Sequence, residues 1–265
     1  MTQNETETTA HTNSMETFQA TIEAERLQTT LALAHTLFDE CHLYVDPEGV
    51  RVTAIDAATV VWADITLEPS AFETFEATSD HIGVDLERFR DVVGIANRGQ
   101  SVQLSLDSAT RTLQIRFDEL EYTLALLDPE TIRSPPAESR EAFTPSGTVV
   151  ADSATFDRSV RAAAMVSNHL EFDLDEDDGQ FSVIAAGDTD NVSLTLSADD
   201  LVDIEPGDAH SIFSIDYLSA INRAMPSGVD IDLQFGTEQP LSVGYEFADG
   251  TGAVEYLVAP RITAN

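Results

Sequence analysis

The stretch HIGVDL at residues 81–86 decides the fold, because the stretch IFSIDY at residues 212–217 resembles it and both lead into a helical pattern. After the first, apolar residues recur at helical spacing over 85–97, and after the second they do so over 216–225. The order of the predicted elements around these stretches also repeats. Each half of the chain reads strand, helix, several strands, helix and several strands, so we infer an internal duplication within an α+β fold.

Residues 128–147 divide the two repeats. This segment holds four prolines and several charged residues, which excludes a central strand or the interior of a helix. A segment of this length without regular structure is typical of a connection between domains. We therefore predict a first domain at 15–127, an interdomain connector at 128–147 and a second domain at 148–265. Residues 1–14 have almost nothing to bury and are predicted to be a disordered extension.

Alternation of apolar and polar residues predicts the strands, and a 3.6-residue period predicts the helices. In the first repeat we predict helices at 25–40 and 85–97 and strands at 17–24, 42–45, 50–55, 59–67, 101–106, 112–117 and 122–127. In the second repeat we predict helices at 156–168 and 216–225 and strands at 148–153, 170–174, 181–186, 191–196, 229–235, 241–247 and 252–258.

The charge of the chain is strongly negative. There are 48 acidic residues against 13 basic ones, all of them arginine, and the formal net charge is −35. Such a surface repels itself in dilute buffer, but at 1 M salt the screening length falls to about 3 Å. Because the acids are spread along the chain, we predict a cytoplasmic protein of a cell that keeps molar salt. The alternative is that the acids bind metal or a basic partner.

Enzyme motifs are missing from the sequence. There is no GxSxG, HExxH, P-loop or CxxC pattern, and the six histidines are scattered. Asp173, Asp175, Asp177 and Asp178 superficially resemble a calcium loop, but they lack its 12-residue spacing and closing glutamate, and a hairpin turn is the better interpretation. We expect no catalytic residue, no metal site and no cofactor. No apolar run is long enough to span a membrane, and the single cysteine, Cys41, excludes an internal disulfide.

Several short motifs resemble the proliferating cell nuclear antigen (PCNA) family of DNA sliding clamps. The ending YLVAPRI at 256–262 is similar to the Tyr-Leu-Ala-Pro-Lys-Ile ending of that family. IDAATV at 55–60 resembles the segment before its peptide-binding loop, and LLDP at 126–129 resembles the start of its interdomain connector. The resemblance runs from about residue 15 to residue 262. The absence of lysine and the many acids make the chain look like the halophilic archaeal branch.

The resemblance implies a ring of three identical subunits, with helices lining the central hole and sheets outside. Double-stranded DNA would thread the hole and be held weakly, by topology. DNA polymerase, clamp loader, nuclease and ligase would dock through short peptides. Two alternatives stay open at this point. One is a clamp-fold subunit of a hetero-oligomer or a regulatory clamp, and the other is a halophilic hydrolase that uses paired carboxylates.

The resemblance also implies positions for the contacts with DNA. Arginines lie on or beside the four predicted helices although the rest of the surface is acidic. Arg158, Arg161 and Arg223 match DNA-facing basic positions of the family, and we add Arg26 and Arg90. A solvated helix face is the alternative interpretation of these five residues.

Two further sets of residues follow from the resemblance. The partner-peptide pocket is expected to be formed by apolar residues beside the connector: Ile55, Trp62, Ile132, Pro240, Leu257 and Pro260. The subunit interface is expected to pair two exposed sheet edges, at 111–117 and 181–186. The residues expected there are Arg111, Leu113, Ile115, Phe117, Phe181, Val183 and Ala185.

Overall fold

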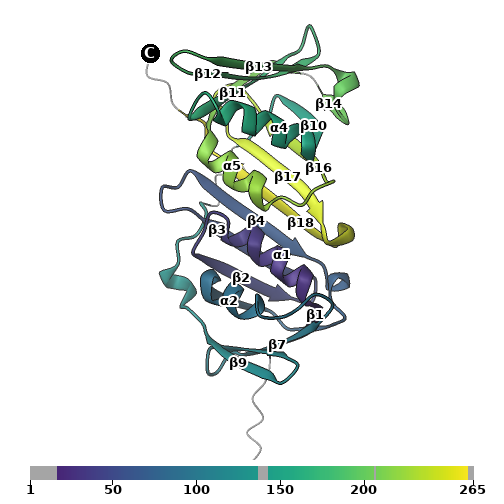
Figure 1. Cartoon of the computed structure of the whole chain (residues 1–265). Coiled ribbons are helices and arrows are strands. Elements are labelled where there is room, and N and C mark those ends of the chain that lie inside the picture. Colours follow the sequence, from purple (N-terminus) through teal and green to yellow (C-terminus); the bar gives the residue numbers. More distant parts are fainter. Residues whose placement is uncertain (1–16, 137–142, 206, 262–265) are drawn as a thin grey trace, which may run out of the picture.

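The computed structural model of the chain describes residues 17–136, 143–205 and 207–261. Four α-helices of eight or more residues occur in these ranges: α1 (Ala24–His35), α2 (Leu86–Val93), α4 (Ser153–Ala164) and α5 (Ile215–Ala224). Figure 1 shows all four on the same side of the molecule, in a column that continues from one half to the other. The strands lie behind them, so the fold has a helical face and a sheet face.

The strands of the first half alternate with short turns. They are β1 (Phe18–Glu23), β2 (Glu40–Asp46), β3 (Gly49–Ile55), β4 (Val61–Leu67), β5 (Thr74–Ala77), β6 (Asp80–Asp85), β7 (Ser101–Asp107), β8 (Thr112–Phe117) and β9 (Leu120–Ala125). Two 3₁₀ turns, η1 (Pro69–Ala71) and η2 (Pro129–Thr131), also occur there.

The second half repeats this arrangement. Its strands are β10 (Gly147–Asp152), β11 (His169–Asp175), β12 (Gln180–Ala186), β13 (Asn191–Leu196), β14 (Asp203–Glu205), β15 (Ala209–Ser214), β16 (Asp230–Phe235), β17 (Leu241–Phe247) and β18 (Gly252–Val258). The 3₁₀ turns are η3 (Ala198–Asp200) and η4 (Ala248–Gly250).

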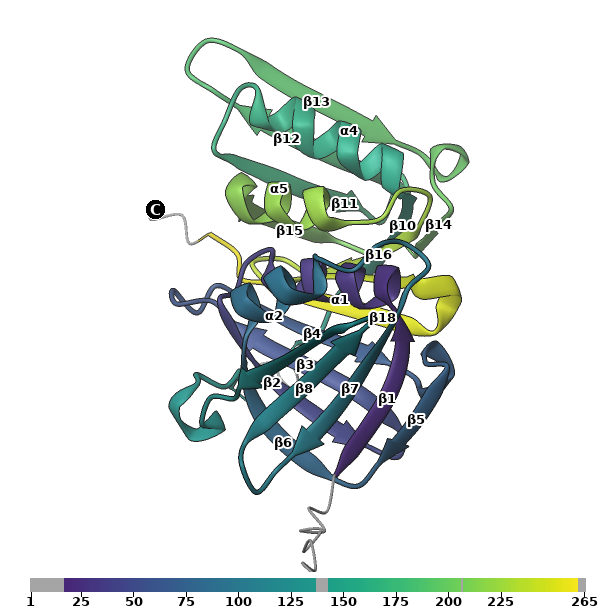
Figure 2. The same ribbon diagram turned by 60° about the horizontal axis from the view of Figure 1, so that its bottom comes forward.

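Three antiparallel sheets arise from these strands. A five-stranded sheet has the order β5-β1-β7-β8-β9, and a four-stranded sheet has the order β13-β12-β11-β15. The third sheet has nine strands in the order β14-β10-β16-β17-β18-β4-β3-β2-β6, so it contains strands of both halves. Figure 2 shows the five-stranded sheet lying across from β2, β3 and β4 of this large sheet, with α1 and α2 along one side.

The pairing of β18 with β4 joins the two halves. Seven residue pairs are in register, from Gly252 with Leu67 to Val258 with Val61. Beside this seam the buried hydroxyl of Tyr256 donates a hydrogen bond of 2.9 Å to the carbonyl of Leu33 in α1. The backbone hydrogen bonds and this buried side-chain bond hold the halves together across one continuous sheet.

Two of the four helices, α2 and α4, begin after an aspartate that caps the first turn. Asp85 precedes α2 and its carboxylate accepts from the backbone N–H of Arg88. Asp152 precedes α4 and accepts from the backbone N–H groups of Ala154 and Thr155. Each cap satisfies donors that the first turn leaves unpaired. The α4 stripe of Phe156, Ser159, Val160 and Ala163 is buried, so this helix packs on its sheets with one face only.

The structure corrects several predicted elements. The first helix ends at His35 instead of residue 40, and the helix predicted at 156–168 lies at Ser153–Ala164. β5, β6, β14 and β15 were not predicted as strands. β5 and β14 have no fully buried residue and only four and three residues, so their sequences carry almost no apolar alternation. The predicted extension at 1–14 lies outside the described residues.

The start of the connector is fastened to β6. The backbone N–H of Leu127 donates to the carbonyl of Gly83, and Ile132 is only 6% exposed. A Cβ atom on Gly83 would lie 2.5 Å from Cδ1 of Ile132 and 3.0 Å from the carbonyl oxygen of Leu127. The glycine therefore leaves the space that the connector fills.

Gly83→Ala is expected to displace Ile132 and to lower the free energy of unfolding by about 1–3 kcal/mol, as overpacking usually does. The matched control is Gly244→Ala on the same face of the same sheet, where the nearest atom to a Cβ is 3.8 Å away. The control should be neutral or slightly stabilising. Denaturant unfolding in about 2 M KCl measures both. Equal losses in the two variants would contradict this account of the connector.

Candidate docking groove and arginine-bearing helix face

An apolar row crosses the seam between the halves on the sheet face away from the helices. Ile55 of β3 pairs directly with Trp62 of β4, and Trp62 pairs directly with Leu257 of β18. Directly opposed residues of antiparallel strands point to the same face. Three of the six residues predicted for the peptide pocket are therefore neighbours in space, although 202 positions separate the first from the last.

A groove of about 230 Å³ opens beside Trp62, between the sheet and the connector. Its lining residues are Tyr44, Arg51, Thr53, Trp62, Asp64, Ser134, Pro135 and Pro136. The Trp62 side chain is 9% exposed, and its indole Nε1 is buried with no hydrogen-bond partner among the described residues. A buried donor of this kind costs free energy until an acceptor reaches it.

An ion pair closes one side of the groove. Nε and Nη2 of Arg51 donate to the two carboxylate oxygens of Asp64 at 2.8 and 2.5 Å. The Asp64 side chain is 7% exposed, while half of the Arg51 side chain faces solvent. The hydrogen bond to Asp64 raises the pKa of Arg51 above its usual value. The pair neutralises a nearly buried carboxylate. Unpaired, this charge would repel an acidic occupant of the groove and would be costly to cover with an apolar one.

Two histidines hold the connector on the other side. Nε2 of His42 lies 3.0 Å from the hydroxyl of Ser134, and Nδ1 of His42 lies 3.0 Å from Nε2 of His81. The His81 ring stacks on Tyr44 with centroids 4.2 Å apart. Burial, with a further contribution from His42, lowers the pKa of His81 below 6.5, while Asp80 opposes the shift. The lowered pKa favours the uncharged form of His81, the ring that stacks on Tyr44.

A buried aspartate shapes the turn at the end of the row. The Asp56 carboxylate accepts backbone N–H bonds from Ala58, Val60 and Val61 at 2.7–3.1 Å, and the hydroxyl of Tyr217 in α5 donates to it at 3.1 Å. The chain after β18 then runs alongside, because Ala259 N–H donates to the carbonyl of Val60 at 2.8 Å. The turn, α5 and the C-terminal segment are thus fixed to one another.

The remaining three predicted pocket residues lie apart from the row. Ile132 is buried against Gly83, so its side chain anchors the connector, and its place in the pocket stays a prediction. Pro240 and Pro260 are half-buried, and they lie in segments that flank β15 and follow β18. The sequence analysis missed Tyr44, Arg51 and Asp64, although alternation along the strands places them on the same face as Trp62.

The five predicted arginines are all on helices of the helical face. Arg158, Arg161 and Arg223 are exposed and point away from the buried stripes of α4 and α5. Arg161 pairs with Asp157 at 3.3 Å, one turn earlier in the helix. Arg26 instead reaches Asp249 of η4 at 3.0 Å, and Arg90 pairs with Asp91 at 3.6 Å. Acidic neighbours therefore partly offset the positive charge of this face.

The two strands predicted to be sheet edges, β8 and β12, are interior strands in the structure. β8 lies between β7 and β9, and β12 lies between β11 and β13, so both are paired on each side. Leu113, Ile115, Phe117, Phe181, Val183 and Ala185 are buried in the core of the subunit itself. The expectation that these two strands form exposed edges was therefore wrong. The strands that lie beyond β8 and β12 and end these two sheets are β9 and β13. They carry exposed polar residues and the half-exposed Tyr122.

Comparison with known proteins identifies the family. The family model for the N-terminal domain of proliferating cell nuclear antigen matches residues 18–125. A DNA polymerase sliding clamp of Haloarcula marismortui is 44% identical over 92% of this chain and 98% of its own length. The chain belongs to the PCNA family of DNA polymerase sliding clamps. A second clamp, from Halobacterium salinarum, is 43% identical over 94% of this chain and its entire length.

Solved structures agree with the fold of this sliding clamp. A structure of the C-terminal region of FEN-1 bound to A. fulgidus PCNA superposes with a TM-score of 0.87 and 27% identity, over 94% of this chain and all of that chain. PCNA of Thermococcus kodakaraensis gives 0.81, also at 27% identity, over 92% of this chain. The predicted family, α+β fold and sliding-clamp function are confirmed. Because clamps of this family are non-catalytic, the hydrolase alternative is discarded.

No helix of the described residues is long and apolar enough to cross a membrane.

Proposed function

We propose that this sliding clamp closes into a homotrimeric ring by pairing β9 of one subunit with β13 of the next. The support lies in the two edges. Each ends its sheet, and β13 (NVSLTL) has no charged residue to discourage pairing with another strand. The edges belong to different sheets in different halves, so each subunit offers one of each kind. Head-to-tail pairing of that type would cover β9 and β13 of every subunit in a closed ring.

The mass of the clamp in solution tests the ring. Light scattering after size exclusion in about 2–3 M KCl should give three times the 28.8 kDa chain mass. Tyr122→Glu places a charge on the β9 edge and should shift the mass toward that of one chain. The control Ile95→Glu changes a more exposed apolar residue just after α2, and it should leave the mass unchanged. A wild-type monomer at every salt concentration would contradict the homotrimer and favour a hetero-oligomeric clamp.

We also propose that partner proteins dock a short peptide over the apolar row and the groove beside it. Ile55, Trp62 and Leu257 offer a continuous apolar surface, and we keep Pro240 and Pro260 as proposed contacts beyond it. The unpartnered Nε1 of Trp62 adds a donor for one carbonyl or side-chain oxygen of the peptide. A related clamp is named for its complex with the C-terminal region of FEN-1, which supports a peptide as the ligand here. Polymerase, loader, nuclease and ligase would share this surface.

A peptide titration tests the docking surface. Trp62 is the single tryptophan, so its fluorescence should change saturably when a peptide from the C-terminal region of FEN-1 is added. Ile55→Glu puts a charge into the apolar row and should weaken binding by about tenfold or more, or 1.4 kcal/mol. Thr66→Glu adds the same charge elsewhere on the same sheet face and should change affinity less than about twofold. Equal effects of both charges would point to general repulsion instead of a specific site.

The helical face is proposed to face DNA. Arg90, Arg158, Arg161 and Arg223 are exposed there, whereas Arg26 is partly buried and paired with Asp249. Few cations and many acidic neighbours make the affinity for phosphates low, and molar salt lowers it further. Retention must then come from closure of the ring around the duplex. We also propose that the protein works in a cytosol with molar salt. The net charge of −35 and the similarity to clamps of halophilic archaea support this.

A further inference from the structure

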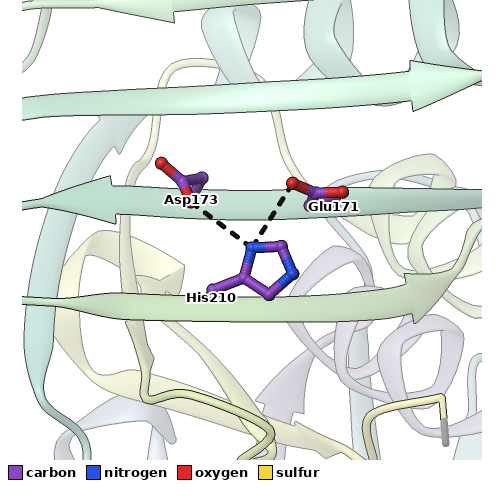
Figure 3. Close-up of side chains that lie close together, drawn as sticks. All are labelled: Glu171, Asp173 and His210. Atoms are coloured by element: carbon purple, nitrogen blue, oxygen red, sulfur yellow. Dashed lines mark hydrogen bonds and ion pairs between the residues drawn. The ribbon is translucent and has the colours of Figure 1, made fainter. Parts of the chain in front are cut away.

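The outer face of the four-stranded sheet carries a cluster that the sliding-clamp function does not use. Glu171 and Asp173 lie two residues apart on β11, and His210 lies on the neighbouring strand β15 directly opposite Asp173. Nδ1 of His210 is 3.3 Å from a carboxylate oxygen of Glu171 and 3.3 Å from one of Asp173. Figure 3 shows both carboxylates converging on the same ring nitrogen.

We propose that Glu171, Asp173 and His210 form a binding site for a divalent transition-metal ion of the Zn²⁺ type. Two carboxylate oxygens and one imidazole nitrogen are a ligand set that such ions use, with a fourth position left for water or another ligand. Mg²⁺ and Ca²⁺ prefer oxygen ligands throughout and would make less use of the imidazole.

The spacing of the donor atoms fits this ion. Metal–ligand bonds of about 2.1 Å at tetrahedral angles place neighbouring ligand atoms about 3.4 Å apart. Both distances from Nδ1 of His210 are 3.3 Å, and the three ligand atoms lie within 4.8 Å of one another. A metal ion could therefore bind between these three ligand atoms with small side-chain movements.

The charge balance favours a divalent cation over a proton. Two carboxylates and a neutral imidazole carry a charge of −2, a protonated imidazole reduces this only to −1, and a divalent ion neutralises it. The side chains are partly buried, with exposed fractions of 30% for Glu171, 42% for Asp173 and 45% for His210. Screening by salt is weaker for partly buried charges than for exposed ones, so the repulsion between the carboxylates persists in salt.

The site is held by the backbone on both sides. Asp173 is paired across β11 with Ser182 of β12 as well as with His210 of β15. The carbonyl of His210 accepts from the N–H of Glu238, and the carbonyl of Ile212, opposite Glu171, accepts from the N–H of Arg261. The segments that carry Pro240 and Pro260 thus run along the same strand. A bound ion would stiffen β15 next to the proposed docking surface.

Titration of metal-free full-length clamp in about 2 M KCl tests the proposal. Zn²⁺ should bind at one equivalent per chain by equilibrium dialysis, and Co²⁺ should give the visible absorption of a site with fewer than six ligands. His210→Gln and Asp173→Asn should each weaken Zn²⁺ binding by about tenfold or more, or 1.4 kcal/mol. Binding should also weaken as the pH is lowered, because protons compete with the metal for its ligand atoms.

Matched controls separate a site from adsorption to an acidic surface. His169→Gln removes an imidazole from β11, the strand of Glu171 and Asp173, and Asp177→Asn removes a charge from the turn that follows β11. Both variants should leave Zn²⁺ binding unchanged. The proposal is overturned if His210→Gln binds Zn²⁺ as tightly as the wild type, or if equimolar Mg²⁺ displaces the Zn²⁺. Circular dichroism of each variant without metal shows whether the sheet is intact, so that a loss of binding through misfolding is recognised.

Discussion

The pairing of β4 with β18 is the constraint on which the rest of the structure depends. Seven registered residue pairs convert two repeats into one sheet and fix how the repeats face each other. The same register brings Ile55, Trp62 and Leu257 into one apolar row on the sheet face. It also places α1 and α5 side by side on the opposite face, where Thr36 of one half donates to the carbonyl of Ala220 in the other. Both functional faces of the clamp therefore depend on a single strand pairing.

Sequence patterns predicted the repeat but not the sheet order. HIGVDL and IFSIDY mark equivalent strand-to-helix junctions, and the structure places β6 before α2 and β15 before α5 at these positions. The choice of edge strands failed because alternation reports which face of a strand is buried and says nothing of its neighbours. The strands of Leu113 and Val183 alternate well because they are interior strands with one face in the core. β9 and β13, which do end their sheets, expose residues such as Tyr122 and Ser193.

The candidate sites were predictable to different extents. Ile55 and Leu257 were predicted for the pocket because they lie in motifs that resemble the family, and Trp62 lies two residues after one of them. Ile132 was predicted for the pocket from the same resemblance, and only the structure shows its side chain packed against Gly83. His210 lies 37 residues from Asp173 in the sequence, so its cluster with two acids becomes visible only through the β11–β15 register. With acidic residues this abundant, spacing alone could not separate that cluster from a solvated turn.

The electrostatics of the chain and its mode of action are consistent with each other. A protein that gripped phosphates tightly would need many free cations, yet Arg26, Arg90 and Arg161 each pair with an acid of their own subunit. A closed ring needs no such grip, because the duplex cannot leave it sideways.

The most direct measurement is retention of the clamp on nicked circular DNA, after loading by the clamp loader of the same host, before and after the circle is cut. The account predicts that the clamp stays on the circle in molar salt and is lost once a restriction enzyme linearises it. Equal retention on circular and linear DNA would show that direct binding, and not topology, holds the protein, and would contradict the account.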